Sequence, residues 1–110
     1  MIRYILENIE QEIYIIPDIV NEIYITKSSI DHLILSKDCR IIQGVDNIIK
    51  KITLNSKLVF LCLANSGIED IIFATLENYK KLYIINIKNN PIKDPSIKAK
   101  LKEICDIYEE

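Results

Sequence analysis

The sequence predicts an α/β fold: a solenoid with short parallel strands on its concave side, irregular or helical connectors on its convex side, and a C-terminal capping helix. Three observations support this prediction. Two segments of the chain superimpose when Leu58 is placed on Leu82 (82 − 58 = 24). An earlier segment repeats the same apolar spacing, and the final segment has the periodicity of an amphipathic helix.

The two superimposable segments are LVFLCLANSGI, which begins at Leu58, and LYIINIKNNPI, which begins at Leu82. They agree in character at six positions, which pair Leu58 with Leu82, Leu61 with Ile85, Leu63 with Ile87, Asn65 with Asn89, Ser66 with Asn90 and Ile68 with Ile92. The earlier segment IDHLILSKDCRI has the same internal spacing at Ile30, Leu33 and Leu35. Its distance from Leu58 is greater (58 − 30 = 28), so the period drifts.

The pattern L-x-x-L-x-L-x-x-N-x-I, with a period in the twenties, resembles that of leucine-rich repeats. The resemblance covers residues 30–110 and is most specific in IEDIIFATLENYKKLYIINIKNNPI. It implies one domain over residues 1–110, with about three repeats over 30–95 and a capping helix over 96–109. Residues 1–29 are expected to form an N-terminal cap or an irregular first repeat. Within them DIVNEIYIT should be extended, because it is similar to the later NIIKKITLN.

Each predicted repeat begins with a strand whose alternate side chains point to the core. Asn90 follows the last such strand, where its amide can satisfy backbone groups that the turn leaves unpaired. Ser66 takes the same position one repeat earlier. The connector IEDIIFATLENYK has apolar residues at mixed spacings of three and four, which favours a loose helical crossover. In the longer connector before Leu58, Ile52 and Leu54 indicate an extra extended piece.

The terminal helix is predicted from Ile97, Leu101, Ile104 and then Ile107 or Tyr108, which follow helical spacing after Pro95. Ser96 is positioned to cap its start. An amphipathic helix over the last repeat would cover an end that otherwise exposes core and a strand edge.

Several functional classes are excluded by what the sequence lacks. The net charge is −2 and about half of the residues are apolar, which is typical of a globular protein. The chain has one histidine, His32, and two glycines, too few for a histidine-based site or a phosphate loop. The acidic pair Glu69 and Asp70 has no further ligands in view. The sequence therefore predicts no catalytic residue, no metal and no cofactor.

The predicted location is intracellular, cytoplasmic or nuclear. Acidic residues interrupt the first segment too early for a secretory signal, and no apolar run approaches the about 18 residues of a membrane helix. The three cysteines, Cys39, Cys62 and Cys105, are odd in number and lack zinc-site spacing. We interpret them as reduced thiols in a soluble protein.

The predicted binding surface is the concave face. Ile34, Phe60, Cys62 and Ile84 occupy outward positions and are expected to form an apolar stripe across adjacent strands, which marks an interaction site more often than chance. The resemblance likewise implies a non-enzymatic adaptor or a small subunit of a larger complex. We expect a helix or extended peptide of a partner protein to contact His32, Ile34, Phe60, Cys62, Ile84, Asn86 and Lys88. Alternatively, residues 1–29 cover this face, or the strand register differs.

Charge is distributed unevenly. Residues 1–31 carry six acidic and two basic side chains, for −4, and residues 80–102 carry seven lysines against Asp94, for +6. Lys93, Lys98, Lys100 and Lys102 could meet RNA or an acidic partner. They lack arginine and interleaved aromatics, so a solvated helix face is the preferred interpretation.

A second interpretation keeps parallel strands in a different fold. The chain would be a single α/β domain similar to STAS regulators, with LVFLCLANSGIEDI as a central strand leading to a helix. Such a domain acts through partner binding or phosphorylation, and Ser66 would be the modified residue. The short segment between the strands and the unexplained NNPI favour the solenoid.

Overall fold

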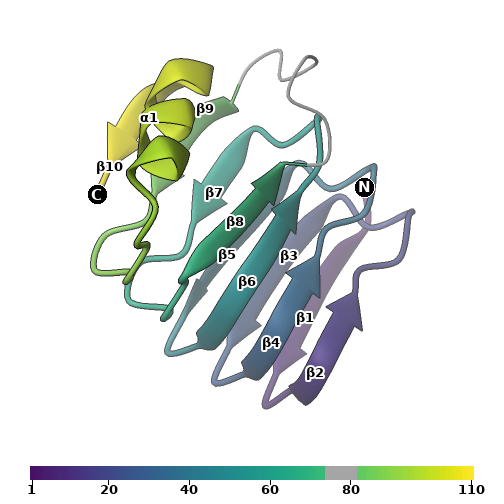
Figure 1. Cartoon of the computed structure of the whole chain (residues 1–110). Coiled ribbons are helices and arrows are strands. Elements are labelled where there is room, and N and C mark those ends of the chain that lie inside the picture. The colour runs from purple at the N-terminus through teal and green to yellow at the C-terminus, as the bar shows by residue number, and fades with distance from the viewer. Residues whose placement is uncertain (74–81) are drawn as a thin grey trace.

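The computed structural model describes residues 1–73 and 82–110. The chain winds as a strand-rich parallel β-solenoid of about five turns with a C-terminal helix (Figure 1). Its elements are β1 (Arg3–Glu7), β2 (Glu10–Ile15), β3 (Glu22–Thr26), β4 (Ser29–Ile34), β5 (Ile41–Val45), β6 (Ile48–Leu54), β7 (Phe60–Cys62), β8 (Asp70–Phe73), β9 (Leu82–Asn86), α1 (Pro95–Ile104) and β10 (Cys105–Glu109).

The strands form two walls around the core. One wall is a six-stranded sheet in the order β1-β3-β5-β7-β9-β10, and the other is a four-stranded sheet in the order β2-β4-β6-β8. Every pairing between the described strands is parallel and joins one turn of the coil to the next. From β1 to β9, consecutive strands of the chain therefore alternate between the walls, and β10 returns to the six-stranded sheet beside β9 (Figure 1).

The first turns of the coil have one common length. In the six-stranded sheet Arg3 pairs with Glu22, Glu22 with Ile41, and Ile41 with Phe60, which are equal steps along the chain. Ser28 and Asn47, which are hydrogen-bonded across one such turn, have the same separation of 19 in the sequence. The step from Phe60 to Ile84 is longer, and it equals the separation of 24 between Ser66 and Asn90. The shift found between Leu58 and Leu82 thus belongs to a single longer turn.

The predicted solenoid is confirmed, but the α/β class is wrong. The connectors predicted to be irregular or helical contain the strands of a second sheet, including the extended piece expected at Ile52 and Leu54, which lies in β6. β8 occupies part of the predicted crossover IEDIIFATLENYK, and the rest of that segment, including Leu76 and Tyr79, lies outside the described residues. Strands suit this wall because β4 and β6 satisfy their backbone groups by pairing with the turns on either side. This architecture does not support the leucine-rich-repeat assignment.

The same apolar motif serves both walls, which explains the drifting period. Ile30, Leu33 and Leu35 lie on or just after β4 in the four-stranded sheet, whereas the motif that begins at Leu58 accompanies β7 in the six-stranded sheet. The chain between Ile30 and Leu58 therefore makes one regular turn and then passes from one wall to the other. The two units are not equivalent positions of one repeat.

Residues 1–29 form regular turns of the same coil, where an irregular cap or first repeat was expected. β1, β2 and β3 all lie within this segment. The extended structure predicted for DIVNEIYIT is confirmed by β3. VNEIYITKSSI is too short for a full turn because it runs from β3 on one wall into β4 on the other.

The core is a stack of aliphatic side chains between the walls. In each turn the motif sends side chains inward beside the six-stranded sheet, and the four-stranded sheet supplies matching ones. The buried members of the first wall include Leu6, then Val20, Ile23 and Ile25, then Cys39 and Ile42, then Leu58, Leu61 and Leu63, then Leu82, Ile85 and Ile87. Burying apolar area, at about 25 cal/mol per Å², drives this packing.

A ladder of polar side chains closes the corner after these strands. Asn90 accepts hydrogen bonds from the backbone N–H groups of Ser66 (3.0 Å) and Ile68 (2.9 Å) and donates to the carbonyl oxygens of Leu63 (2.8 Å) and Ile87 (2.9 Å). The role predicted for this asparagine is therefore confirmed.

Asn47 has the equivalent role two turns earlier. Its Oδ1 accepts from the N–H of Ser28 (3.1 Å), and its Nδ2 donates to the carbonyl of Ile25 (2.9 Å). Gly44 leaves the space that this side chain needs, because a Cβ there would lie 2.9 Å from the Asn47 amide nitrogen and 2.1 Å from the Ile25 carbonyl oxygen. A glycine therefore stands at this inward position, because an aliphatic side chain there would displace the Asn47 amide.

A residue with a positive φ precedes each of the ladder residues Ser28, Asn47, Ser66 and Asn90, and a fifth precedes Ile9 at the first corner. These residues are Asn8, Lys27, Asp46, Asn65 and Asn89, with φ between 52° and 58°. Asparagine and aspartate tolerate this left-handed conformation better than most residues, and four of the five positions carry one of them. The corner is therefore encoded by two adjacent residues.

The C-terminal cap is a helix followed by a strand. Helix α1 begins after Asp94, whose carboxylate accepts from the N–H of Ser96 (2.9 Å), so the cap is Asp94 and not Ser96 as predicted. Leu101 is its buried residue. The predicted helix over 96–109 stops at Ile104, because β10 then pairs in parallel with β9. In the described part of the chain, no helix combines the length and apolar character needed to cross a membrane.

The ladder gives a stability test. Asn47→Ala leaves the buried N–H of Ser28 and the carbonyl of Ile25 without their partners, which should lower the free energy of unfolding by about 3 kcal/mol. Gln43→Ala is the matched control, since Gln43 is an exposed amide in the same turn. Urea unfolding followed by circular dichroism measures both. Equal stabilities of the two variants would show that the ladder does not hold the corner.

Candidate functional site

The outer surface of the six-stranded sheet carries a continuous line of apolar side chains. Ile41, Phe60, Ile84 and Ile107 lie in register on β5, β7, β9 and β10. The first three are partly buried and Ile107 is 41% exposed. We call these four residues the apolar row.

The apolar row has further apolar neighbours on one side and polar ones on the other. Val59 and Tyr83 precede Phe60 and Ile84 in the chain, and both are exposed. On the opposite side the next position of each strand is occupied by Gln43, Cys62, Asn86 and Glu109. An apolar centre with a polar border has the composition of a protein interface.

An ion pair ends the apolar row toward the N-terminus. Glu22 precedes Ile41 in the register, and Arg3 precedes Glu22. The Nε of Arg3 donates to Glu22 at 2.8 Å. The row therefore occupies the C-terminal four strands of the six-stranded sheet.

Five of the seven predicted contact residues lie together. In the pairing of β7 with β9, Phe60 lies beside Ile84 and Cys62 lies beside Asn86. Lys88 follows β9 and forms an ion pair with Glu109 at 3.3 Å. The predicted grouping of these five residues across neighbouring strands is thus what the structure shows.

His32 and Ile34 do not join this group, and the predicted stripe that included Ile34 is wrong in that respect. Both residues lie on β4, which belongs to the four-stranded sheet on the other wall. The physical reason is the alternation of strands between walls. The prediction also missed Ile41 and Ile107. Ile41 lies one turn before Phe60, so it could have been identified from the shorter period of the first turns.

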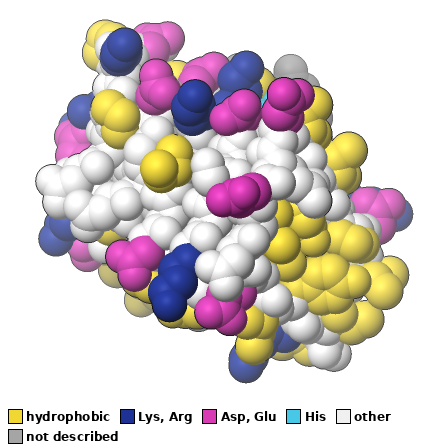
Figure 2. All heavy atoms as spheres, turned by 90° about the horizontal axis from the view of Figure 1, so that it is seen from below, with side chains coloured by type: hydrophobic (Ala, Val, Ile, Leu, Met, Phe, Trp, Pro, Cys, Tyr) yellow, Lys and Arg dark blue, Asp and Glu magenta, His cyan; other side chains and the backbone are white. Residues whose placement is uncertain are grey.

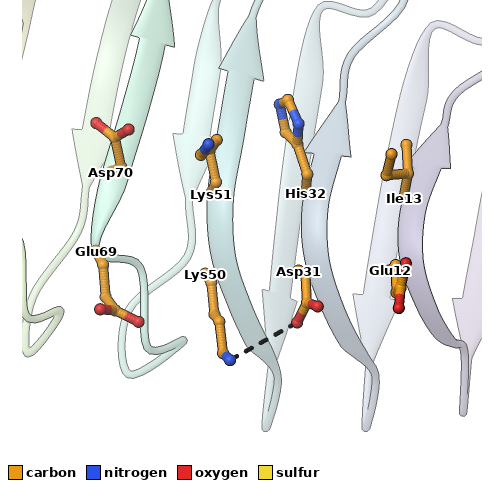
Figure 3. A pocket seen from close by; sticks show the side chains of 8 residues that line it. All are labelled: Glu12, Ile13, Asp31, His32, Lys50, Lys51, Glu69 and Asp70. Carbon is orange, nitrogen blue, oxygen red and sulfur yellow. Dashed lines mark ion pairs between the residues drawn. The ribbon is translucent and has the colours of Figure 1, made fainter.

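The four-stranded sheet presents charged side chains around a shallow hollow (Figure 3). The hollow is lined by Glu12, Ile13, Asp31, His32, Lys50, Lys51, Glu69 and Asp70. Lys50 forms an ion pair with Asp31 at 3.8 Å, and the Nε2 of His32 lies 2.7 Å from the hydroxyl of Thr53. Opposite charges from neighbouring turns therefore partly balance one another on this wall.

No metal site can be built from the part of the chain that the structure describes, because no group of three or more histidine, cysteine, aspartate or glutamate side chains lies close enough together. The acidic residues Glu69 and Asp70 instead border the charged hollow. They extend two rows of side chains on the four-stranded sheet (Figure 3).

The lysines considered for nucleic-acid binding have partners within the chain. Lys98 and Lys102 form ion pairs with Glu110 at 3.5 and 3.1 Å, and Lys100 pairs with Glu103 at 3.8 Å. A hydrogen bond from Lys102 lowers the pKa of the Glu110 carboxyl. Lys93 lies apart, exposed before α1. The structure thus gives these lysines carboxylate neighbours rather than a purely basic surface.

Ser66 is a structural residue of the corner. It is fully buried, and its hydroxyl donates to the carbonyl of Ala64 at 3.2 Å. A kinase could not reach this hydroxyl without opening the corner. Ser66, the phosphorylation site of the STAS-like interpretation, therefore lies inside the solenoid.

All three cysteines are free thiols. Cys39 is fully buried, and burial raises its pKa to about 12, although a backbone hydrogen bond with Ile41 acts in the other direction. Cys62 and Cys105 are partly buried, and burial raises the pKa of each thiol as well. Cys62 lies beside the apolar row, so a reagent attached there reports on that surface.

No protein-family model, no curated protein and no solved structure matches this chain. Function must therefore be argued from the surface itself. The two walls offer different chemistry, since one carries the apolar row and the other carries balanced charges around a hollow.

The thiols give a test of the two environments. At about pH 8, iodoacetamide should modify Cys62 and Cys105 faster than Cys39, because alkylation requires the thiolate and a raised pKa lowers its fraction at any given pH. Mass spectrometry of timed samples measures each rate. Unfolding in urea should equalise the three rates, and rapid modification of Cys39 in the folded protein would contradict its position in the core.

Proposed function

We propose that this chain is a non-enzymatic protein–protein interaction module, an adaptor or small subunit of a larger complex, that binds a partner protein on the outer face of the six-stranded sheet. The observation that carries the proposal is the apolar row, four aliphatic or aromatic side chains in register on adjacent strands. Three residues of the apolar row are partly buried and Ile107 is exposed, and the neighbouring Val59 and Tyr83 are exposed as well. Contiguous apolar surface of this kind favours an interaction site.

The composition around the apolar row supports the proposal. Phe60 lies near its centre and Tyr83 beside it, and aromatic side chains are enriched among the residues that dominate binding energy. Cys62, Asn86 and Lys88 provide a polar border that can fix the orientation of a partner. Because the step along the row is the strand spacing of about 4.8 Å, its side chains match the apolar stripe of an α-helix, where i and i+3 or i+4 are about 5–6 Å apart.

The proposed partner is therefore an amphipathic helix of another protein, lying across the strands. The free cysteines fit a reducing compartment, which supports an intracellular location for the complex. This proposal does not depend on membership of the leucine-rich-repeat family. RNA binding through the lysines near α1 is the weaker candidate, since carboxylates already accompany most of them.

The experiment that tests the proposal is affinity capture from the protein's own cells, with quantitative mass spectrometry. Phe60→Asp places a charge at the centre of the apolar row and should remove a stoichiometric partner, because a buried unpaired carboxylate costs at least about 2 kcal/mol at an interface. Ile72→Asp is the matched control, since Ile72 is a 38% exposed isoleucine on the outer face of β8, in the other wall.

The two variants separate the possible results. Loss of the partner with Phe60→Asp and its retention with Ile72→Asp support the proposal, provided that circular dichroism shows both variants folded. A partner retained by both variants, or lost only with Ile72→Asp, contradicts binding at the apolar row. Steep loss of binding with added salt and copurifying RNA would favour the lysines instead.

A further inference from the structure

The two ends of the solenoid differ. At the C-terminal end, β10 pairs with β9 and α1 packs its buried Leu101 against the core. At the other end β1 and β2 are the outermost strands of their sheets, and in the described residues each pairs with a neighbour on one side only. We call the exposed surface of β1 and β2 the N-terminal face.

The N-terminal face is rich in apolar side chains. Ile5 is 69% exposed on β1, and Ile13 and Ile15 are 57% and 66% exposed on β2. Tyr4 on β1 and Tyr14 on β2 point inward at this end and are only partly buried. Figure 2 shows hydrophobic side chains gathered at this end of the molecule, on its right-hand side. An unpaired strand edge beside such a surface is a template for pairing with another strand.

The sequence of β1, RYILE, is complementary to itself. In an antiparallel pair centred on Ile5, Arg3 stands directly opposite Glu7 of the partner subunit, and residues directly opposite each other point to the same face. Both of these side chains point outward with Ile5, while Tyr4 meets the partner's Leu6 on the inner face. The pair therefore has two ion pairs around an isoleucine contact outside and continues the apolar core inside.

Arg3 can make this second contact while keeping its first. Its side chain is 66% exposed although its Nε donates to Glu22. A guanidinium has five N–H donors, so the remaining ones can reach another carboxylate. Glu7 is itself exposed at the end of β1.

We propose that two copies of this chain associate end to end through their N-terminal faces, with β1 pairing antiparallel to the partner's β1 about a two-fold axis at Ile5. β1 is the pairing strand, and β2 is not, because β2 begins with Glu10 and Glu12, which have no basic residue on the same strand to oppose them. A two-fold contact uses the same patch on both subunits and closes, so it yields a dimer and not a fibre.

The first measurement is the molar mass of the purified chain by sedimentation equilibrium across a dilution series. The unmodified protein should be a reversible dimer. Ile5→Asp places two carboxylates opposite each other at the axis and should weaken the dimer at least about tenfold, since like charges directly opposite are destabilising. Val45→Asp is the matched control, because Val45 is 50% exposed on the same wall at β5, away from the edge.

Charge exchange gives the sharper test. Arg3→Glu and Glu7→Arg should each weaken self-association, because each places like charges opposite one another. An equimolar mixture should form a heterodimer, in which every position 3 again faces an opposite charge at position 7. Thermal unfolding of each variant alone checks that it is folded, in particular Arg3→Glu, which also removes the bond to Glu22.

Four results overturn the proposal. The first is an unmodified chain that is monomeric at all concentrations, and the second is an Ile5→Asp variant that stays dimeric. The third is a Val45→Asp variant that dissociates as readily as Ile5→Asp, and the fourth is a failure of the two charge variants to combine. Phe60→Asp should leave the dimer intact, because the apolar row is away from β1. If Phe60→Asp alone produced monomers, the apolar row would be the contact between copies.

Discussion

At the corners that follow β1, β3, β5, β7 and β9, the chain turns inside the protein, and the backbone groups there need hydrogen-bond partners. Asn47 and Asn90 supply them with side-chain amides that bond to the turn before them. Ser28 and Ser66 take intermediate positions, and each accepts or donates through its hydroxyl. Because the side chains of Ser28, Asn47 and Asn90 bond to a neighbouring turn, this ladder holds successive turns in register.

Features of the fold that are local in the sequence could be predicted, whereas those that depend on how the turns stack could not. The strand, asparagine turn and returning isoleucine around Leu82 and Asn90 are local features, and their prediction from sequence was sound. The second wall was not predicted, because a motif shared by both walls looks like one repeat of irregular length. The motifs at Ile30 and Leu58 differ in the wall to which they belong, and only the pairing register between turns shows this difference. That register depends on how the turns stack and cannot be read from one segment alone. The turn from β7 to β9 is longer than the turns before it, so comparing the segments at Leu58 and Leu82 hid the shorter period.

The alternation of strands between the walls also explains which residues of the candidate site were predicted correctly. Phe60 and Ile84 belong to adjacent turns of one wall, so the comparison of the segments at Leu58 and Leu82 brought them together correctly. Ile41 lies one shorter turn away, and Ile107 lies beyond a helix whose end the apolar spacing placed too late. His32 and Ile34 were assigned to the same face because the prediction had one strand per turn. With two strands per turn, both residues belong to the four-stranded sheet, where His32 lines the charged hollow with Lys50, Lys51 and Asp70 (Figure 3).

The stacking of turns also determines how this chain can fold. A turn shares its hydrogen bonds and apolar contacts only with the turns immediately before and after it, as in other solenoids. Contacts between residues one turn apart close short loops, so little chain entropy is lost with each added turn. Folding can therefore begin at one pair of turns, where Ile49, Ile52 and Leu54 are wholly buried, and proceed outward in steps. The terminal turns, each with a neighbour on one side, would then be the last to form and the first to exchange their amide protons.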